Sequence, residues 1–223
     1  MASYAAAAKA QSEIYSSLKV LWQFLSSPRW NTKSNRSRIR LLEYFENADE
    51  VHRSSEVPNL QDVLAGIRVE LRNTQNGRQG CVIVVEDIEP SQVEMLGEAL
   101  DIDPVFFAGY LGTDFRNLEH HALPLWATTL PSESASQESL HLHHQRPTRL
   151  TTNAVIPKHV ILVTNGNVVR AVRRLSTIGD TNVALVRSCC SLIRKVFESG
   201  FWICMFKRSH CAIHIADDDE FQA

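Results

Sequence analysis

The chain has 223 residues, of which 44% are hydrophobic and 22% charged, and its formal net charge is −2. These proportions are those of an ordinary globular protein with enough apolar residues for a core. The small net charge gives no general positive field, which argues against nucleic acid and anionic membranes as partners. Five cysteines without regular spacing argue against a secreted disulfide framework and favour reduced thiols in the cytoplasm.

Residues 3–27 are predicted to form a helix that docks on the rest of the domain. Leu18, Leu21 and Leu25 recur at helical spacing and form part of one apolar stripe. Pro28 ends the helix because the residue before a proline disfavours helical backbone. A helix that packs on a partner is the alternative.

Neither a secretion signal nor a membrane-spanning helix is predicted. Lys9 and Glu13 interrupt the N-terminal segment before it reaches the length of a signal sequence. A spanning helix needs about 20 predominantly apolar residues. The best candidate, residues 196–206, is much shorter and contains Glu198.

The basic stretch 29–40 has two interpretations. It resembles a nucleic-acid or localisation patch in charge, but it has no interleaved aromatic residues. We favour a solvated loop that enters a strand, because residues 38–41 alternate polar and apolar side chains with the period of a half-buried strand.

The centre of the chain predicts two helices around one strand. Asn59 is suited to cap a helix whose apolar positions run from Leu60 to Leu71. Strand Cys81–Val85 is apolar on both faces, which predicts a central place in its sheet. Ser91, with Glu94 three residues on, predicts a capping box at the start of the next helix.

Asp101 and Asp103 suggest a carboxylate pair, but helix capping explains the second of them better. Pro104 follows Asp103 at the first helical position, where its missing N–H has no cost. The acids at the end of Val82–Asp87 resemble a Walker B strand, yet the chain has no phosphate-binding loop of the form GxxxxGK[ST]. We therefore expect no ATPase.

The C-terminal half predicts three strands and one helix. The strands are Leu140–Gln145, Val160–Thr164 and Trp202–Phe206, and an irregular connection follows the first of them. Residues 183–197 are predicted to be helical. The acidic tail after Lys207 is expected to be solvated and disordered.

His141 and His143 are the candidate metal ligands. They alternate in a predicted strand, so both side chains lie on one face. Zinc needs three or four converging ligands, and the sequence supplies only this pair on a shared face. A polar stripe is the alternative. We expect no cofactor, and Mg²⁺ and Zn²⁺ are the ions to test.

No catalytic residue is predicted. Hydrolase and dinucleotide motifs such as GxSxG and GxGxxG are absent. A cysteine nucleophile at Cys189 or Cys190 is the alternative, since nearby basic residues lower thiol pKa values. Apolar neighbours on the same segment favour packed, inert thiols.

Residues 81–111 carry a resemblance to a known family. A β-branched strand leads through acidic residues and Pro90 into two successive helices, and this passage resembles the soluble N-terminal domain of fungal CorA-like divalent-cation transporters. Residues 141–146 resemble a histidine-containing strand of that domain. A second block has a similar order of short segments: Asn167–Leu175, Val186–Ser191 and Trp202–Cys204.

The resemblance covers residues 36–206 and implies a fold more clearly than an activity. It implies a three-layer α/β/α unit around a mixed sheet that lies on the cytoplasmic side and helps regulate the pore. Val169 stands where the family tends to have proline, and the GMN motif of the CorA pore is missing. No metal-sensing carboxylate of the family matches a residue here. Transport by this chain alone is therefore not expected.

We predict an α/β fold, with α+β as the alternative, in three parts. Residues 1–35 form the N-terminal helix and basic linker, 36–206 the CorA-like domain, and 207–223 the flexible tail. The expected function is that of a non-enzymatic cytoplasmic CorA-like protein, a truncated relative of a transporter or part of a longer gene product. The alternative is a free-standing metal- or ligand-binding module that uses His141 and His143.

The expected partners are further copies of the chain or full-length CorA-like relatives. Neither nucleic-acid binding nor membrane insertion is expected.

Overall fold

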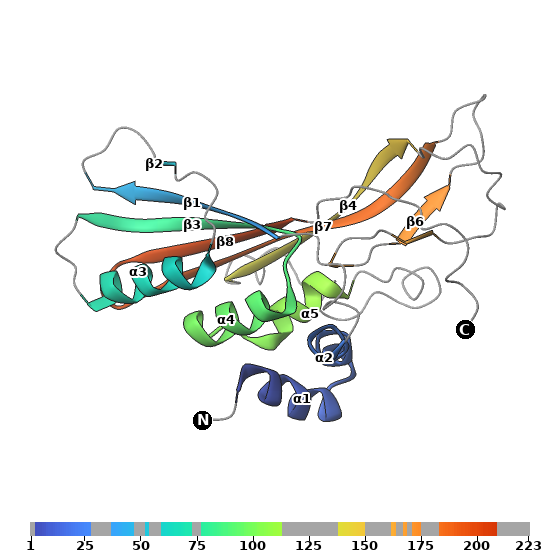
Figure 1. Cartoon of the computed structure of the whole chain (residues 1–223), viewed down its shortest axis with the longest axis horizontal. Coiled ribbons are helices and arrows are strands. Elements are labelled where there is room, and N and C mark those ends of the chain that lie inside the picture. The colour runs from blue at the N-terminus through green and yellow to red at the C-terminus, as the bar shows by residue number, and fades with distance from the viewer. Residues whose placement is uncertain are drawn as a thin grey trace.

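The computed structural model describes residues 3–27, 37–46, 52–53, 59–72, 77–112, 138–149, 162–163, 167–168, 171–174 and 183–208. These residues combine helices with a mixed β-sheet, which confirms the predicted α/β class. Figure 1 shows the sheet across the top of the molecule and the helices beneath it.

The described strands form an eight-stranded sheet in the order β2-β1-β3-β8-β7-β6-β5, with β4 paired to β7. Strand β3 lies between β1, which is antiparallel to it, and β8, which is parallel. The central position predicted for this apolar strand is therefore confirmed. The bounds are β1 Arg38–Phe45, β2 His52–Arg53, β3 Arg78–Glu86, β4 Ser139–Arg149, β5 Leu162–Val163, β6 Ala171–Arg174, β7 Val183–Val196 and β8 Trp202–Arg208.

Strand β7 corrects the sequence analysis, which predicts a helix over residues 183–197. Its register with β4 is continuous from Val183 to Ile193, so successive side chains alternate between the two faces. The buried positions are Ala184, Val186 and Ser188 on one face and Cys189, Ser191 and Ile193 on the other. The buried side chains thus lie on one face in the first half of the strand and on the other face in the second half. No single alternation of buried and exposed residues runs along the strand, and the apolar spacing resembles that of a helix.

The N-terminal segment forms two helices where one is predicted. Helix α1 (Tyr4–Ile14) ends at Tyr15, whose extended backbone breaks the helix, and a single 3-10 turn leads into α2 (Lys19–Ser26). The Tyr4 hydroxyl donates to the backbone oxygen of Ile102 at 3.0 Å. Leu21 of α2 is buried in the same core as the sheet. The predicted docking of this segment on its own domain is confirmed.

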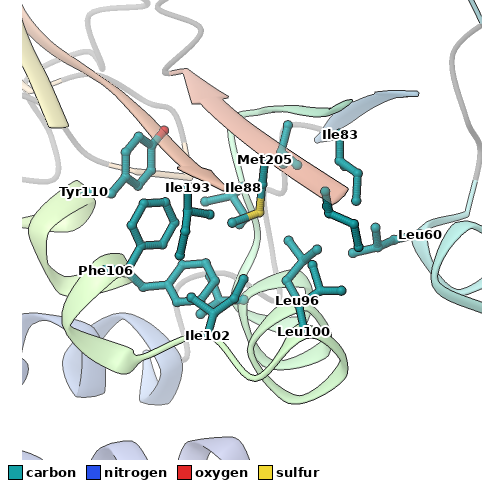
Figure 2. Close-up of a cluster of buried hydrophobic side chains, with 14 of the residues drawn as sticks. Leu60, Ile83, Ile88, Leu96, Leu100, Ile102, Phe106, Tyr110, Ile193 and Met205 are labelled. Atoms are coloured by element: carbon teal, nitrogen blue, oxygen red, sulfur yellow. The ribbon is translucent and has the colours of Figure 1, made fainter. Parts of the chain in front are cut away.

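Helices α3 (Leu60–Arg72), α4 (Pro90–Leu100) and α5 (Pro104–Leu111) complete the helical side. Figure 2 shows Ile83 and Met205 from the sheet meeting Leu96 of α4 and Phe106 of α5. The described helices all lie on this one face of the sheet (Figure 1). The second helical layer of a three-layer unit is not among the described residues.

Two of the three predicted helix caps are confirmed. The Asn59 side chain accepts from the backbone N–H of Gln61 at 3.0 Å, and Asp103 accepts from that of Val105 at 2.8 Å. The predicted cap at Ser91 is wrong, because α4 begins one residue earlier, at Pro90. Glu89 is its N-cap and forms a capping box with Gln92, a type of box in which Glu replaces the usual Ser or Thr.

Two strand ends differ from the predictions. Strand β4 continues to Arg149, past the predicted end at residue 145, because its pairing with β7 persists through this stretch. Strand β8 continues through Lys207 to Arg208, so the predicted start of the tail at 207 is two residues early. Of the strand predicted at 160–164, only residues 162–163 are described, and they are paired with β6. Residues 209–223 lie outside the described part.

Candidate functional site

Asp87 forms a buried junction at the end of β3. Its side chain accepts the backbone N–H of Asn167 at 3.1 Å and that of Val168 at 3.4 Å. The Asn167 side-chain amide donates to the backbone oxygen of Asp87 at 2.8 Å. Asp87 is 5% exposed and Asn167 1%. The acid thus ends a strand, as the sequence analysis favours, and it also fixes a segment 80 residues away.

His141 and His143 lie on one face of β4, as predicted. Their backbone partners on β7 are Ser191 and Cys189, which are core-facing. A hydrogen bond of 2.7 Å joins His141 Nδ1 to Ser191 Oγ. The pKa of His141 is lowered to about 4, mainly by burial and in addition by the positive charge of Lys207 and by the proximity of His143. This imidazole is therefore neutral at pH 7.

The two histidines are not joined by a third ligand in the part of the chain that the structure describes. No group of three or more His, Cys, Asp or Glu side chains there is arranged to hold a metal ion. The histidine pair at 120–121 lies outside the described residues.

Lys207 is a buried basic residue that the sequence analysis does not identify. Its side chain is fully buried on the core face of β8. Its Nζ lies 3.9 Å from the ring centre of Phe107, 4.1 Å from that of Phe106 and 4.6 Å from that of Tyr110, all on α5. Cation–π attraction offsets part of the cost of burying the ammonium group. The signal in the sequence is the alternation Ile203, Met205, Lys207, which places all three on one face.

Among the cysteines of the described part, Cys81 and Cys189 are buried, and Cys190 and Cys204 are partly buried. Burial raises the pKa of Cys81 to about 11 and also raises that of Cys204. Cys189 is fully buried, and its Sγ lies 3.5 Å from Ser191 Oγ. Because the thiolate is the reactive form, these positions favour inert thiols. Asp101 and Asp103 are exposed and serve as the C-cap of α4 and the N-cap of α5.

The sheet has a second, largely apolar face, and we call its exposed part the open face. Towards the start of β7 the same face is buried, at Ala184, Val186 and Ser188. Backbone register aligns Arg40, Val84, Phe206, Leu192 and Leu140 in one row across five strands. None of these five belongs to the core cluster beneath the sheet. Leu140 is 59% exposed and Leu192 36%. The open face also includes Leu42, Val82, Leu142, Arg194, Val196, Trp202 and Cys204.

Comparisons with protein families and curated proteins do not place the chain in a family. No known protein-family signature and no curated protein matches it. None of the helices in the described ranges has the length and apolar content needed to cross a membrane.

Proposed function

We propose that this chain is a non-enzymatic, cytoplasmic CorA-like domain protein. It is a truncated relative of a divalent-cation transporter or part of a longer gene product, and it carries no transport activity alone. This proposal rests on the segments that resemble the family, which lie far apart in the sequence.

The observation that carries the proposal is that these segments contact one another. The first block contains most of β3, and Cys81 and Val82 are paired with Ile203 and Cys204 of the last segment. Asp87, which follows β3 in the first block, is bonded to Asn167, which begins the second block. Segments that fold against one another constrain each other's sequence, so their joint resemblance supports a shared scaffold.

The non-enzymatic part of the proposal is supported by the surroundings of the reactive groups. Asp87 accepts structural hydrogen bonds, Cys189 is buried, and the ammonium of Lys207 faces aromatic rings. Catalysis needs such groups beside bound substrate. Here each lies against protein atoms.

A chimera tests the proposal. The full chain is fused in front of the membrane helices of a fungal CorA-like transporter in place of that protein's own soluble domain. We expect the chimera to assemble in membranes and to restore growth of a magnesium-transport-deficient strain, whereas the chain alone does not. A chimera that inserts at normal levels but neither assembles nor transports contradicts the proposal.

The second candidate is a metal- or ligand-binding module. It is favoured by one observation, the position of His141 and His143 on the same face of β4. The low pKa of His141 supports metal binding, whereas its hydrogen bond to Ser191 argues against it. A neutral imidazole is the form that binds metal, but its Nδ1 already has a partner.

A further inference from the structure

The open face has the side-chain pattern of a covered surface. Strand β3 is apolar on both faces, with Ile83 and Val85 towards the helices and Val82 and Val84 towards the open face. Strands with this continuous apolar run occur in sheets that are covered on both sides. In α/β domains the covering element is a helix. The open face therefore has the composition that a packed helix requires.

The charged residues beside the open face indicate the charge that a partner of this face should carry. Arg40 and Arg194 are exposed and lie on β1 and β7, at opposite sides of the apolar residues Val82 and Val84. The chain as a whole carries a net charge of −2, so this positive border is a local feature. A complementary partner carries acidic residues beside its apolar stripe.

We propose that the open face binds an amphipathic helix of a partner protein, with an apolar stripe on the row from Val84 to Leu140 and acidic side chains against Arg40 and Arg194. A second copy of the chain fits poorly, because stacking two open faces opposes arginine to arginine. This proposal does not depend on the CorA-like assignment, since it uses only the shape, apolarity and charge of the sheet.

The test uses the full chain and two labelled helical peptides of about 18 residues, or five turns. Both carry leucines along one face, and one has glutamates and the other lysines at the flanking positions. Fluorescence anisotropy is expected to show saturable binding of the acidic peptide, at least about tenfold tighter than that of the basic peptide. The double variant Arg40→Glu/Arg194→Glu is expected to reverse this preference.

Two substitutions locate the binding surface. Leu140→Asp is expected to weaken binding of the acidic peptide at least about tenfold. Val69→Asp is the matched control, because Val69 is 54% exposed on α3 beneath the sheet, and binding is expected to stay unchanged. Unchanged melting temperatures of the variants show that they fold.

Four outcomes of the binding and association experiments overturn the proposal. They are no saturable binding of either peptide at millimolar concentration, equal binding of both peptides, binding to phosphatidylserine vesicles without peptide binding, and self-association of the free chain through this face. Slow maleimide labelling of Leu140→Cys in the free chain also overturns it, because the face is then closed by the chain itself.

Discussion

Asp87 and Asn167 hold each other in a reciprocal pair: the backbone N–H of Asn167 donates to the carboxylate of Asp87, and the Asn167 amide donates to the Asp87 backbone oxygen. Asp87 adopts a left-handed backbone with φ 53°, which turns the chain sharply between β3 and α4. The pair fastens the connection before β6 to the end of the central strand. It therefore holds Asn167 against the end of β3.

Asp87→Ala should destabilise the protein by about 2–4 kcal/mol. The change removes a buried carboxyl group that accepts from two N–H groups. Alanine also has no polar side chain that would favour the left-handed backbone at this position. Urea denaturation measures the loss. Asp101→Ala is the control, since Asp101 also has a left-handed backbone (φ 48°) but is exposed. It should cost only about 1 kcal/mol, and equal losses would contradict the role assigned to the Asp87 bonds.

The free energy of unfolding should fall as the pH drops from 6.5 to 4 through His141. Its pKa is about 4 in the folded chain against 6.5 for the unfolded residue. The unfolded state therefore binds more protons within this window, and the stabilisation is complete above pH 6.5. His141→Gln should flatten this part of the pH profile, measured by urea denaturation at successive pH values.

Two further variants check this pH effect. His144→Gln changes an exposed histidine on the opposite face of β4 and is the matched control. Lys207→Met removes a positive charge that lowers the His141 pKa, so that pKa should rise in an NMR titration while staying below 6.5 because burial is its largest cause. An unchanged pKa in Lys207→Met would show that the lysine charge does not act on His141.

Gly80→Ala and Gly66→Ala should have opposite effects. A β-carbon at Gly80 would collide with the Trp202 ring and would lie 2.6 Å from the Trp202 backbone oxygen, so the change should cost about 1–3 kcal/mol. Gly66 lies in α3 with no atom within 4 Å of the added carbon, so alanine should stabilise the helix by about 0.5–1 kcal/mol. Thermal melting of both variants measures the difference. A neutral Gly80→Ala would contradict the packing of Trp202 over β3.

Glu89→Ala should cost about 1 kcal/mol, because it removes the N-cap of α4 and its reciprocal bond with Gln92. Ser91→Ala, at an exposed position inside the same helix, should change stability by less than about 0.5 kcal/mol. Chemical denaturation of both variants separates the observed cap from the one that the sequence predicts. A larger loss at Ser91 would reverse this assignment.

The parts of the fold that local sequence determines were predictable. The β-branched run at 81–85 gives a central strand, and Asn59 and Asp103 cap their helices because a cap depends on the next two or three residues. The cap of α4 was missed because Glu89 serves as N-cap in place of the more common serine.

The parts that depend on distant contacts were not predictable. Nothing near Asp87 indicates that its partner is Asn167, and the change of buried face within β7 removes the alternation by which a strand is recognised. Lys207 is buried against three aromatic rings of α5, which lies far from it in the sequence. Strand alternation predicts that His141 and His143, the candidate metal ligands, share a face of β4. It does not predict the hydrogen bond between His141 and Ser191.

The central claim is that this chain is a structural domain in which the chemically suggestive side chains stabilise the fold. Its most direct test is the melting temperature of the full chain and of His141→Gln/His143→Gln, each titrated with micromolar zinc and millimolar magnesium. A ligand that binds the folded state raises the melting temperature. The account predicts no metal-dependent rise in either protein. A rise of several degrees in the wild-type chain that disappears in the double variant would contradict it and establish a metal-binding module.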